Sequence, residues 1–196
     1  MITDAYAAEL KARHASSPTW GASTKKYGAG DFLAQITGRA YVQSVLDFGA
    51  GKQEMRKFLE EHAPHIDYTA YDPGIPGIDN VPKGQFDMVI SCDVLEHVEP
   101  HLIDDTLRQM WSHVKYVMYN NIACSPARHD FTEGPYKGQD LHLIQEPTDW
   151  WYDKHIDAIN DPKLSIQEVR MIQRRHKSTP DGWRERAHII CERLGN

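Results

Sequence analysis

The stretch VLDFGAG, from Val45 to Gly51, decides how the chain should fold. A short apolar run, residues 42–48, enters a tight turn with two glycines, which is typical of a buried strand followed by a helix. Glycine lets the backbone turn sharply and brings a ligand close to the main-chain N–H groups at the helix start. The turn is therefore the first candidate for a ligand-binding site.

Strands and helices alternate after this turn, which predicts the α/β class. The patterns predict strands at residues 67–71, 86–92 and 115–121, with helices at 52–62 and 101–114. Such alternation gives right-handed crossovers and a parallel sheet covered on both faces. A helix at 148–159 precedes two last strands, 164–172 and 183–191, which no helix separates. These two strands should form a terminal antiparallel pair.

Two regions depart from the regular alternation. Residues 73–84 hold three prolines and three glycines, so no helix fits there and the third βα unit is reduced to a loop. Near the amino terminus, helical patterns at residues 4–15 and 31–41 flank a loop. We expect a single domain, 1–196, in which residues 1–40 form a helical lid and residues 41–196 form the core.

The composition excludes several classes of protein. Of the 196 residues, 40% are hydrophobic and 26% are charged, which excludes a wholly disordered chain. No run approaches the roughly 18 apolar residues of a membrane helix, and the first residues lack the apolar core of a signal peptide. We therefore expect a cytoplasmic protein without a membrane partner. The net charge of −6 argues against a nucleic-acid partner.

The glycine turn does not match two familiar cofactor-binding motifs. A Walker loop requires GxxxxGK[ST], but position 46 is Leu and position 53 is Gln. A dinucleotide fingerprint requires GxGxxG, and Glu54 stands at the third glycine, where it would place a carboxylate against a pyrophosphate. A nicotinamide-dependent oxidoreductase is therefore disfavoured. The acid before the glycines, Asp47, instead suits a ligand that carries positive charge.

Three motifs in sequence order resemble those of class I S-adenosylmethionine-dependent methyltransferases, in particular small single-domain bacterial and phage members. LDFGAG (46–51) is similar to the first motif, and Asp72 stands where the family keeps the acid that binds the ribose hydroxyls. FDMVISCDVLEHV (86–98) is similar to a later strand motif. The resemblance implies a Rossmann-like, mostly parallel sheet with S-adenosylmethionine as cofactor. The cofactor-binding residues that it implies are Asp47, Phe48, Gly49, Ala50, Gly51, Asp72, Pro73, Asp93 and Val94.

Alternatives to this interpretation remain open at the level of sequence. Asp47 and Asp72 can each be an ordinary turn or strand-end residue, and the chain can be a cofactor-fold binding protein without catalysis. Asp79 is a further candidate for a contact on the adenine side, since the missing βα unit would have supplied one. Residues 20–28 either fold over the cofactor or form a surface loop.

The methyl acceptor should lie beyond the fourth strand of the core. In an open parallel sheet, ligands bind at the carboxyl ends of the strands, and residues 122–145 form an unusually long irregular segment there. We expect His142 to be the general base, near Asp140, with Asp93 beneath the methyl donor; the alternative is a structural histidine. Trp150 and Trp151 either face the acceptor or pack the following helix on the sheet.

The acceptor itself is expected to be a small molecule with an oxygen or nitrogen nucleophile. Arg174 and Arg175 are predicted in the loop between the last two strands, where they either attract an anionic sugar or nucleotide or form a solvated turn. His97 and His101 are four residues apart, but Pro100 lies between them. We therefore expect solvated or capping histidines and no metal site.

Overall fold

A six-stranded sheet with the order β2-β1-β3-β4-β6-β5 forms the centre of the protein. The computed structural model describes residues 2–22, 39–175 and 182–193. The strands are β1 (Ser44–Phe48), β2 (Asp67–Tyr71), β3 (Phe86–Cys92), β4 (Val114–Ala123), β5 (Leu164–Arg175) and β6 (Trp183–Arg193). The helices are α1 (Asp4–Ser16), α4 (Glu54–His62), α5 (Ile103–Ser112) and α6 (Thr148–Ala158), with 3-10 turns η1 (Leu95–His97) and η2 (Pro100–Leu102).

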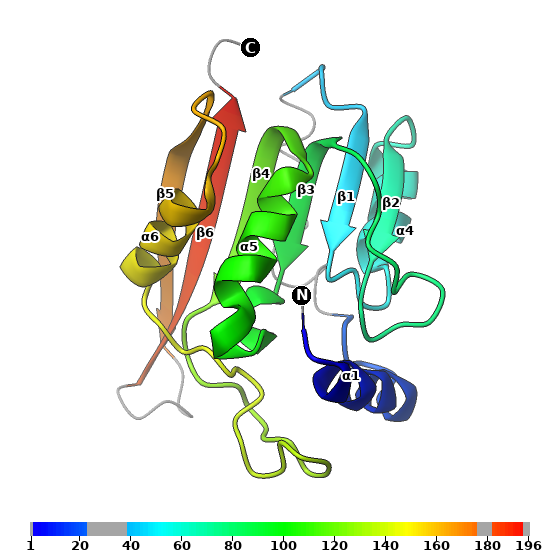
Figure 1. Ribbon diagram of the computed structural model, residues 1–196, viewed down its shortest axis with the longest axis vertical. Helices are drawn as coiled ribbons and strands as arrows, with labels where there is room; N and C mark the ends of the chain where they lie inside the picture. Colours follow the sequence, from blue (N-terminus) through cyan, green and yellow to red (C-terminus); the bar gives the residue numbers. More distant parts are fainter. Residues whose placement is uncertain (1, 23–38, 176–181, 194–196) are drawn as a thin grey trace.

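The strand directions agree with the sequence prediction. β1 pairs in parallel with β2 and β3, and β3 pairs in parallel with β4. β6 runs antiparallel to both β4 and β5. The carboxyl ends of β1, β2, β3, β4 and β5 therefore meet at one edge of the sheet, the lower edge in Figure 1. The Rossmann-like α/β class with a terminal antiparallel pair is confirmed.

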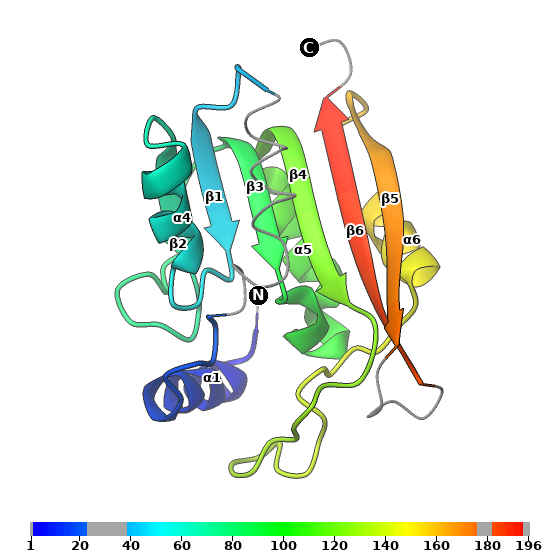
Figure 2. The same cartoon turned by 180° about the vertical axis from the view of Figure 1, so that it is seen from behind.

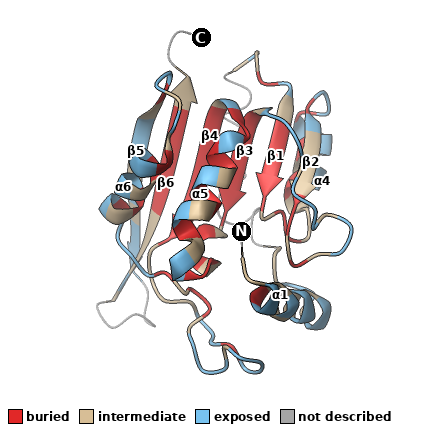
Figure 3. Cartoon of the chain, in the orientation of Figure 1, coloured by how far each residue is buried: buried red, intermediate tan, exposed pale blue. Residues whose placement is uncertain are grey.

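Helices cover both faces of the sheet, as Figures 1 and 2 show from opposite sides. On one face, Trp111 of α5 and Trp151 of α6 pack on Leu46 in one apolar cluster. On the other, Met55 and Leu59 of α4 belong to a second cluster. Figure 3 shows the central strands buried on both sides. Full burial of Trp151 confirms the packing interpretation for this residue of the tryptophan pair.

Several element boundaries differ from the prediction for local reasons. No helix lies between β2 and β3, as the prolines and glycines there predicted. Helix α4 begins two residues late because Gln53 has a left-handed backbone, with φ of 56°. β5 continues to Arg175, so Arg174 and Arg175 lie in a strand and not in the predicted loop. The predicted helix at 31–41 falls mostly outside the described residues. Among the helices described, none is long and apolar enough to cross a membrane.

Helix α1 lies against the carboxyl edge of the sheet, below the strands in Figure 1. Its start is held by the buried carboxylate of Glu99, which accepts hydrogen bonds from the Thr3 backbone N–H (2.8 Å) and hydroxyl (2.9 Å). Tyr136, from the long segment after β4, donates to the same carboxylate at 2.6 Å. Burial raises the pKa of Glu99, but these hydrogen bonds outweigh it and lower that pKa overall. One anion thus joins α1 to two segments of the core.

Replacing Glu99 by Ala should loosen α1 without unfolding the sheet. Three donors lose a charged acceptor, and each such bond contributes roughly 1–3 kcal/mol. Hydrogen–deuterium exchange of the α1 amides should become faster by about tenfold or more, whereas exchange in β1 and β3 should not change. Glu61→Ala, which removes an exposed carboxylate from α4, is the matched control. Equal exchange of α1 in the two variants would contradict this role of Glu99.

Candidate active site

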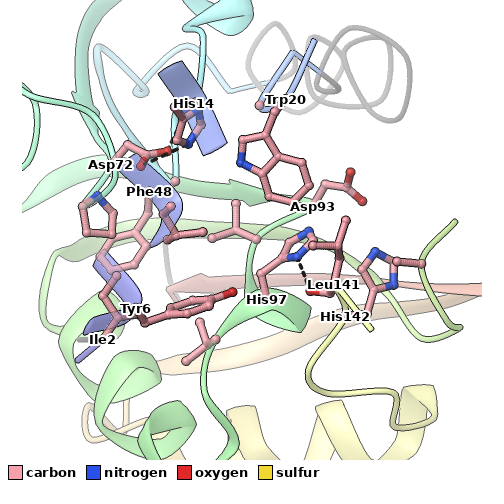
Figure 4. Close-up of a pocket in the computed structure, with 18 of the residues that line it drawn as sticks. Ile2, Tyr6, His14, Trp20, Phe48, Asp72, Asp93, His97, Leu141 and His142 are labelled. Atoms are coloured by element: carbon pink, nitrogen blue, oxygen red, sulfur yellow. Dashed lines mark hydrogen bonds and ion pairs between the residues drawn. The ribbon is translucent and has the colours of Figure 1, made fainter. Parts of the chain in front are cut away.

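A cavity of about 280 Å³ lies between α1 and the carboxyl ends of the strands. Figure 4 shows the side chains that line it from α1, from the strand ends and from the segment after β4. Of the residues predicted from the sequence, those that line the cavity are Phe48, Gly49, Gly51, Asp72, Pro73, Asp93, Val94 and His142. Asp47 and Ala50 are described but do not belong to its lining.

The two glycines of the turn are required by close packing. Gly49 has φ of 87°, and a Cβ added to it would lie 2.4 Å from Cγ2 of Val94. Gly51 has φ of 51°, and its added Cβ would lie 2.3 Å from the carbonyl oxygen of Gly21. A side chain at either position would therefore push away the segment after β3 or the segment after α1. Both segments help to form the cavity.

Asp72 follows β2 and is the acid expected to bind the cofactor ribose. Its two carboxylate oxygens accept hydrogen bonds from the backbone N–H groups of Gly51 (2.9 Å) and Gly74 (2.8 Å). His14 of α1 lies 3.8 Å from Oδ1 of the same carboxylate. Each carboxylate oxygen has further acceptor capacity, and the residue lines the cavity. These carboxylate acceptors fit a ligand with a pair of hydroxyl groups, which would donate to them.

Asp47 lies on the other side of the glycine turn. Its carboxylate is buried and accepts a hydrogen bond from the Tyr68 hydroxyl at 2.6 Å. Burial, and to a smaller extent the charge of Asp72, raises the pKa of Asp47 to about 7. Asp79, the weaker candidate, is exposed and accepts from the backbone N–H of Gly77 at 3.2 Å, also away from the cavity lining.

Asp93 follows β3 with an unusual backbone, since its φ is 63°. Its carboxylate accepts a hydrogen bond from Arg186 of β6 at 2.7 Å, and Arg186 also donates to Asn121 of β4 at 3.0 Å. Burial raises the pKa of Asp93, but the Arg186 guanidinium outweighs it and holds that pKa well below its usual range. Asp93 is therefore a fixed anion in the wall of the cavity.

His142 lies in the segment after β4, where the acceptor was expected. Its Nδ1 is 2.6 Å from the carbonyl oxygen of Ser125, and burial lowers the pKa of the ring. Asp140 does not orient this ring by a hydrogen bond, because its Oδ1 accepts from the backbone N–H groups of Ala127 (2.9 Å) and His142 (2.7 Å). The neutral ring leaves its Nε2 lone pair available on the cavity side.

His97 is packed inside the site, and the expectation of a solvated or capping side chain was wrong. Its ring lies between Trp20 and His142, with centroids at 5.1 Å and 5.0 Å. Its Nδ1 is 2.7 Å from the carbonyl oxygen of Leu141, and burial lowers its pKa to about 4. His101, in contrast, is exposed and lies in a separate 3-10 turn, as Pro100 predicted.

Several residues of the cavity were not identified from the sequence. Tyr6 and His14 of α1 are two of these. Trp20 also lines the cavity, and it begins the segment that the sequence predicted either to fold over the cofactor or to form a surface loop. Residues 23–28 of that segment lie outside the described residues. Arg184 and Arg186 of β6 also line the cavity, whereas Arg174 and Arg175 do not. Because β6 is antiparallel, its first residues lie at the edge where the parallel strands end. The predicted direction of β6 could therefore have identified these two arginines as candidates.

The comparisons with known proteins agree with this geometry. A family profile described as a methyltransferase domain matches residues 21–163, which is more than half of the chain. The chain therefore belongs to this methyltransferase family, and it is a class I enzyme that uses S-adenosylmethionine. No curated protein matches the sequence.

Solved structures with the same fold have low sequence identity to the chain. A 1,6-didemethyltoxoflavin-N1-methyltransferase from Burkholderia thailandensis, with bound 1,6-didemethyltoxoflavin and S-adenosylhomocysteine, has a TM-score of 0.62 at 15% identity; the match covers 96% of this chain and 88% of that one. A putative methyltransferase from Bacillus halodurans has a TM-score of 0.58 at 13% identity, over 86% and 99% of the two chains. An O-methyltransferase from a Brevibacillus brevis multienzyme, in complex with S-adenosylhomocysteine, has a TM-score of 0.55 at 12% identity, over 84% and 71%.

Replacing Asp72 by Ala should weaken the binding of S-adenosylmethionine by roughly tenfold or more, because the loss of hydrogen bonds to a charged acceptor costs about 1–3 kcal/mol. Isothermal calorimetry measures the affinity, and urea denaturation shows whether the variant stays folded. Asp79→Ala removes an exposed acid from the same loop and should leave the affinity unchanged. If the two variants bind the cofactor equally well, Asp72 is not the ribose acid.

Replacing Asp47 by Asn should stabilise the protein above acidic pH. The unfolded carboxyl has an ordinary pKa near 3.8, and the folded one has a pKa of about 7. Between these values the native state binds more protons, so wild-type stability should fall as the pH rises through this range. The stability difference between Asp47→Asn and wild type should therefore grow from about pH 4 to about pH 7, by roughly 1–4 kcal/mol, and then level off.

Urea denaturation across that pH range measures this difference. Asp67→Asn is the control, because Asp67 is an exposed carboxylate on the neighbouring strand. A difference that is constant with pH, or one that shrinks as the pH rises, would contradict the assignment of a buried, easily protonated carboxyl at Asp47.

Proposed function

We propose that the protein transfers the methyl group of S-adenosylmethionine to a small molecule that has a hydroxyl or amine nucleophile and an anionic group. One observation carries this proposal: the cavity of about 280 Å³ has the cofactor acid Asp72 and the glycine turn in one part of its wall and Asp93 and His142 in another. Helix α1 covers the same cavity, which favours a small acceptor over a polymer. The net charge of −6 also disfavours nucleic acid.

The chain's own residues do mainly positioning work in this reaction. The sulfonium of the bound cofactor supplies an activated methyl group, so the protein must hold donor and acceptor in line and exclude water. Asp72 and the glycine turn would hold the cofactor, with Phe48, Pro73 and Val94 beside them. Asp47 supports the turn from the opposite side through Tyr68. The lid formed by α1 excludes water from the donor.

His142 is the residue that we propose to activate the acceptor. It lines the cavity, its Nδ1–H is held by the Ser125 carbonyl, and its Nε2 lone pair remains available. Asp93, fixed by Arg186, lies in the same part of the wall and places negative charge near the sulfonium. A protein that only binds the cofactor would require no basic side chain where the acceptor lies. The presence of His142 there therefore favours a transferase.

The anionic group of the acceptor is inferred from two arginines. Arg128 and Arg184 line the cavity from the segment after β4 and from β6. Guanidinium groups bind phosphate and carboxylate with two parallel hydrogen bonds. These residues take the role that the sequence suggested for Arg174 and Arg175, which lie on β5 opposite Arg184 and Trp183 and do not line the cavity.

The experiment is a methyl-transfer assay with methyl-labelled S-adenosylmethionine and the low-molecular-weight fraction of a cell extract. We expect label in a small product that an anion-exchange column retains. Arg184→Gln should reduce labelling at limiting extract, and the reduction should be larger at low salt, because salt screens the attraction. Arg174→Gln is the matched control, with the same charge change outside the cavity. Label only in macromolecules, or in an uncharged product, would contradict the proposal.

A further inference from the structure

Among the residues that the structure describes, the buried carboxyl of Glu96 has a partner for only one of its oxygens. Glu96 lies in η1, shortly after β3, and is fully buried. Its Oε1 accepts a hydrogen bond from the backbone N–H of Ala123 at 2.8 Å, but no donor in the described part of the chain reaches its buried Oε2. Leaving a buried acceptor unsatisfied costs free energy, and more when the group is charged. This side chain is therefore explained poorly by packing alone.

Two imidazole rings present lone pairs beside this carboxyl. The Nδ1 atoms of His97 and His142 lie 2.7 Å and 2.6 Å from the carbonyl oxygens of Leu141 and Ser125. A carbonyl only accepts hydrogen bonds, so each Nδ1 carries the proton and each Nε2 keeps a lone pair. The rings are nearly perpendicular, at 80°, with centroids 5.0 Å apart. Backbone carbonyls on Nδ1 are the usual supports of metal-binding histidines.

One ligand atom from each of Glu96, His97 and His142 lies within 4.8 Å of the other two. The first two residues come from η1 and the third from the segment after β4, so the fold brings together side chains that are distant in the sequence. Both histidines line the cavity in Figure 4. The three side chains therefore come together next to the place where the acceptor is expected.

We propose that Glu96, His97 and His142 bind one divalent first-row transition-metal cation. Two imidazoles and one carboxylate are a ligand set that such cations favour, and a three-ligand site keeps an open position for substrate. The carboxylate would neutralise half of the cation's charge. Asp93 is held by Arg186 and stays outside the ligand set.

The chemical role of the cation would be to activate the acceptor, and this role rests on the proposed function. A hydroxyl oxygen in the open position would lose its proton to solvent water more easily, because bound cations lower the pKa of their ligands. Methyl transfer then forms the carbon–oxygen bond and breaks the carbon–sulfur bond, whose electron pair stays on sulfur. With the cation bound, the Nε2 lone pair of His142 would bind the cation, and His142 would then activate the acceptor through the cation and not as a free base.

Cobalt(II) is the probe, because its visible absorption reports directly on coordination by histidine. The full-length protein is stripped with a chelator, the chelator is removed, and Co²⁺ is titrated. We expect one bound ion with visible d–d bands, at least tenfold weaker binding in Glu96→Gln and in His142→Ala, and unchanged binding in His101→Ala. Circular dichroism confirms that the variants are folded, and Glu96→Gln preserves the shape of the side chain.

The outcomes separate this proposal from the proposed function. No Co²⁺ binding, or binding that Glu96→Gln and His142→Ala leave unchanged, would overturn the metal site, while methyl transfer by the stripped protein would still support the transferase. Co²⁺ binding as expected without methyl transfer to any small molecule would leave the site standing and overturn the proposed function. Equal methyl transfer with and without the ion would overturn the role in acceptor activation.

Discussion

The junction between the turn after β1 and the end of β2 is the constraint on which the site depends. The backbone N–H groups of Gly49 and Ala50 donate to the carbonyl of Tyr71 at 2.8 Å and 3.0 Å, and the next residue, Asp72, accepts from Gly51. A parallel strand pair alone would bring the two ends near each other; these bonds fix their relative position. Because Asp72 is both a structural acceptor and a cavity residue, this edge of the cavity is already organised before any ligand arrives.

Two carboxylates behave differently at this edge because their partners differ. Asp47 is buried and accepts its hydrogen bond from the neutral phenol of Tyr68, so burial dominates and raises its pKa to about 7. Asp93 is half-buried and faces the guanidinium of Arg186, which stabilises its charge and lowers its pKa. Asp93 and Asp72 both line the cavity, whereas Asp47 does not. Carboxylates on the cavity side would favour a ligand that carries positive charge, as a sulfonium cofactor does.

The features predicted correctly from the sequence are those that hydrophobic periodicity and the backbone freedom of glycine determine. The strand pattern, the loop in place of a third helix and most of the cavity residues near the glycine turn follow from local signals. The position of Arg186 does not, because β6 reads as an ordinary edge strand until its register with β4, Asn121 opposite His188 and Ala123 opposite Arg186, is known. His97 was misjudged for a similar reason: the neighbours that bury it, Trp20 and His142, are far away in the sequence.

The hydrogen bonds of the two histidines limit what they can do. Each ring is anchored through Nδ1 to a carbonyl of an irregular segment, so the tautomer is fixed and the rings cannot exchange donor and acceptor atoms. As a free general base His142 would become positively charged, and the neutral imidazole of His97 at 5.0 Å would not stabilise that charge. A shared cation, as proposed above, would use all three groups at once. It would give the Glu96 carboxyl a partner, bind both lone pairs and leave a position toward the cavity. We therefore propose ligation in preference to proton transfer alone.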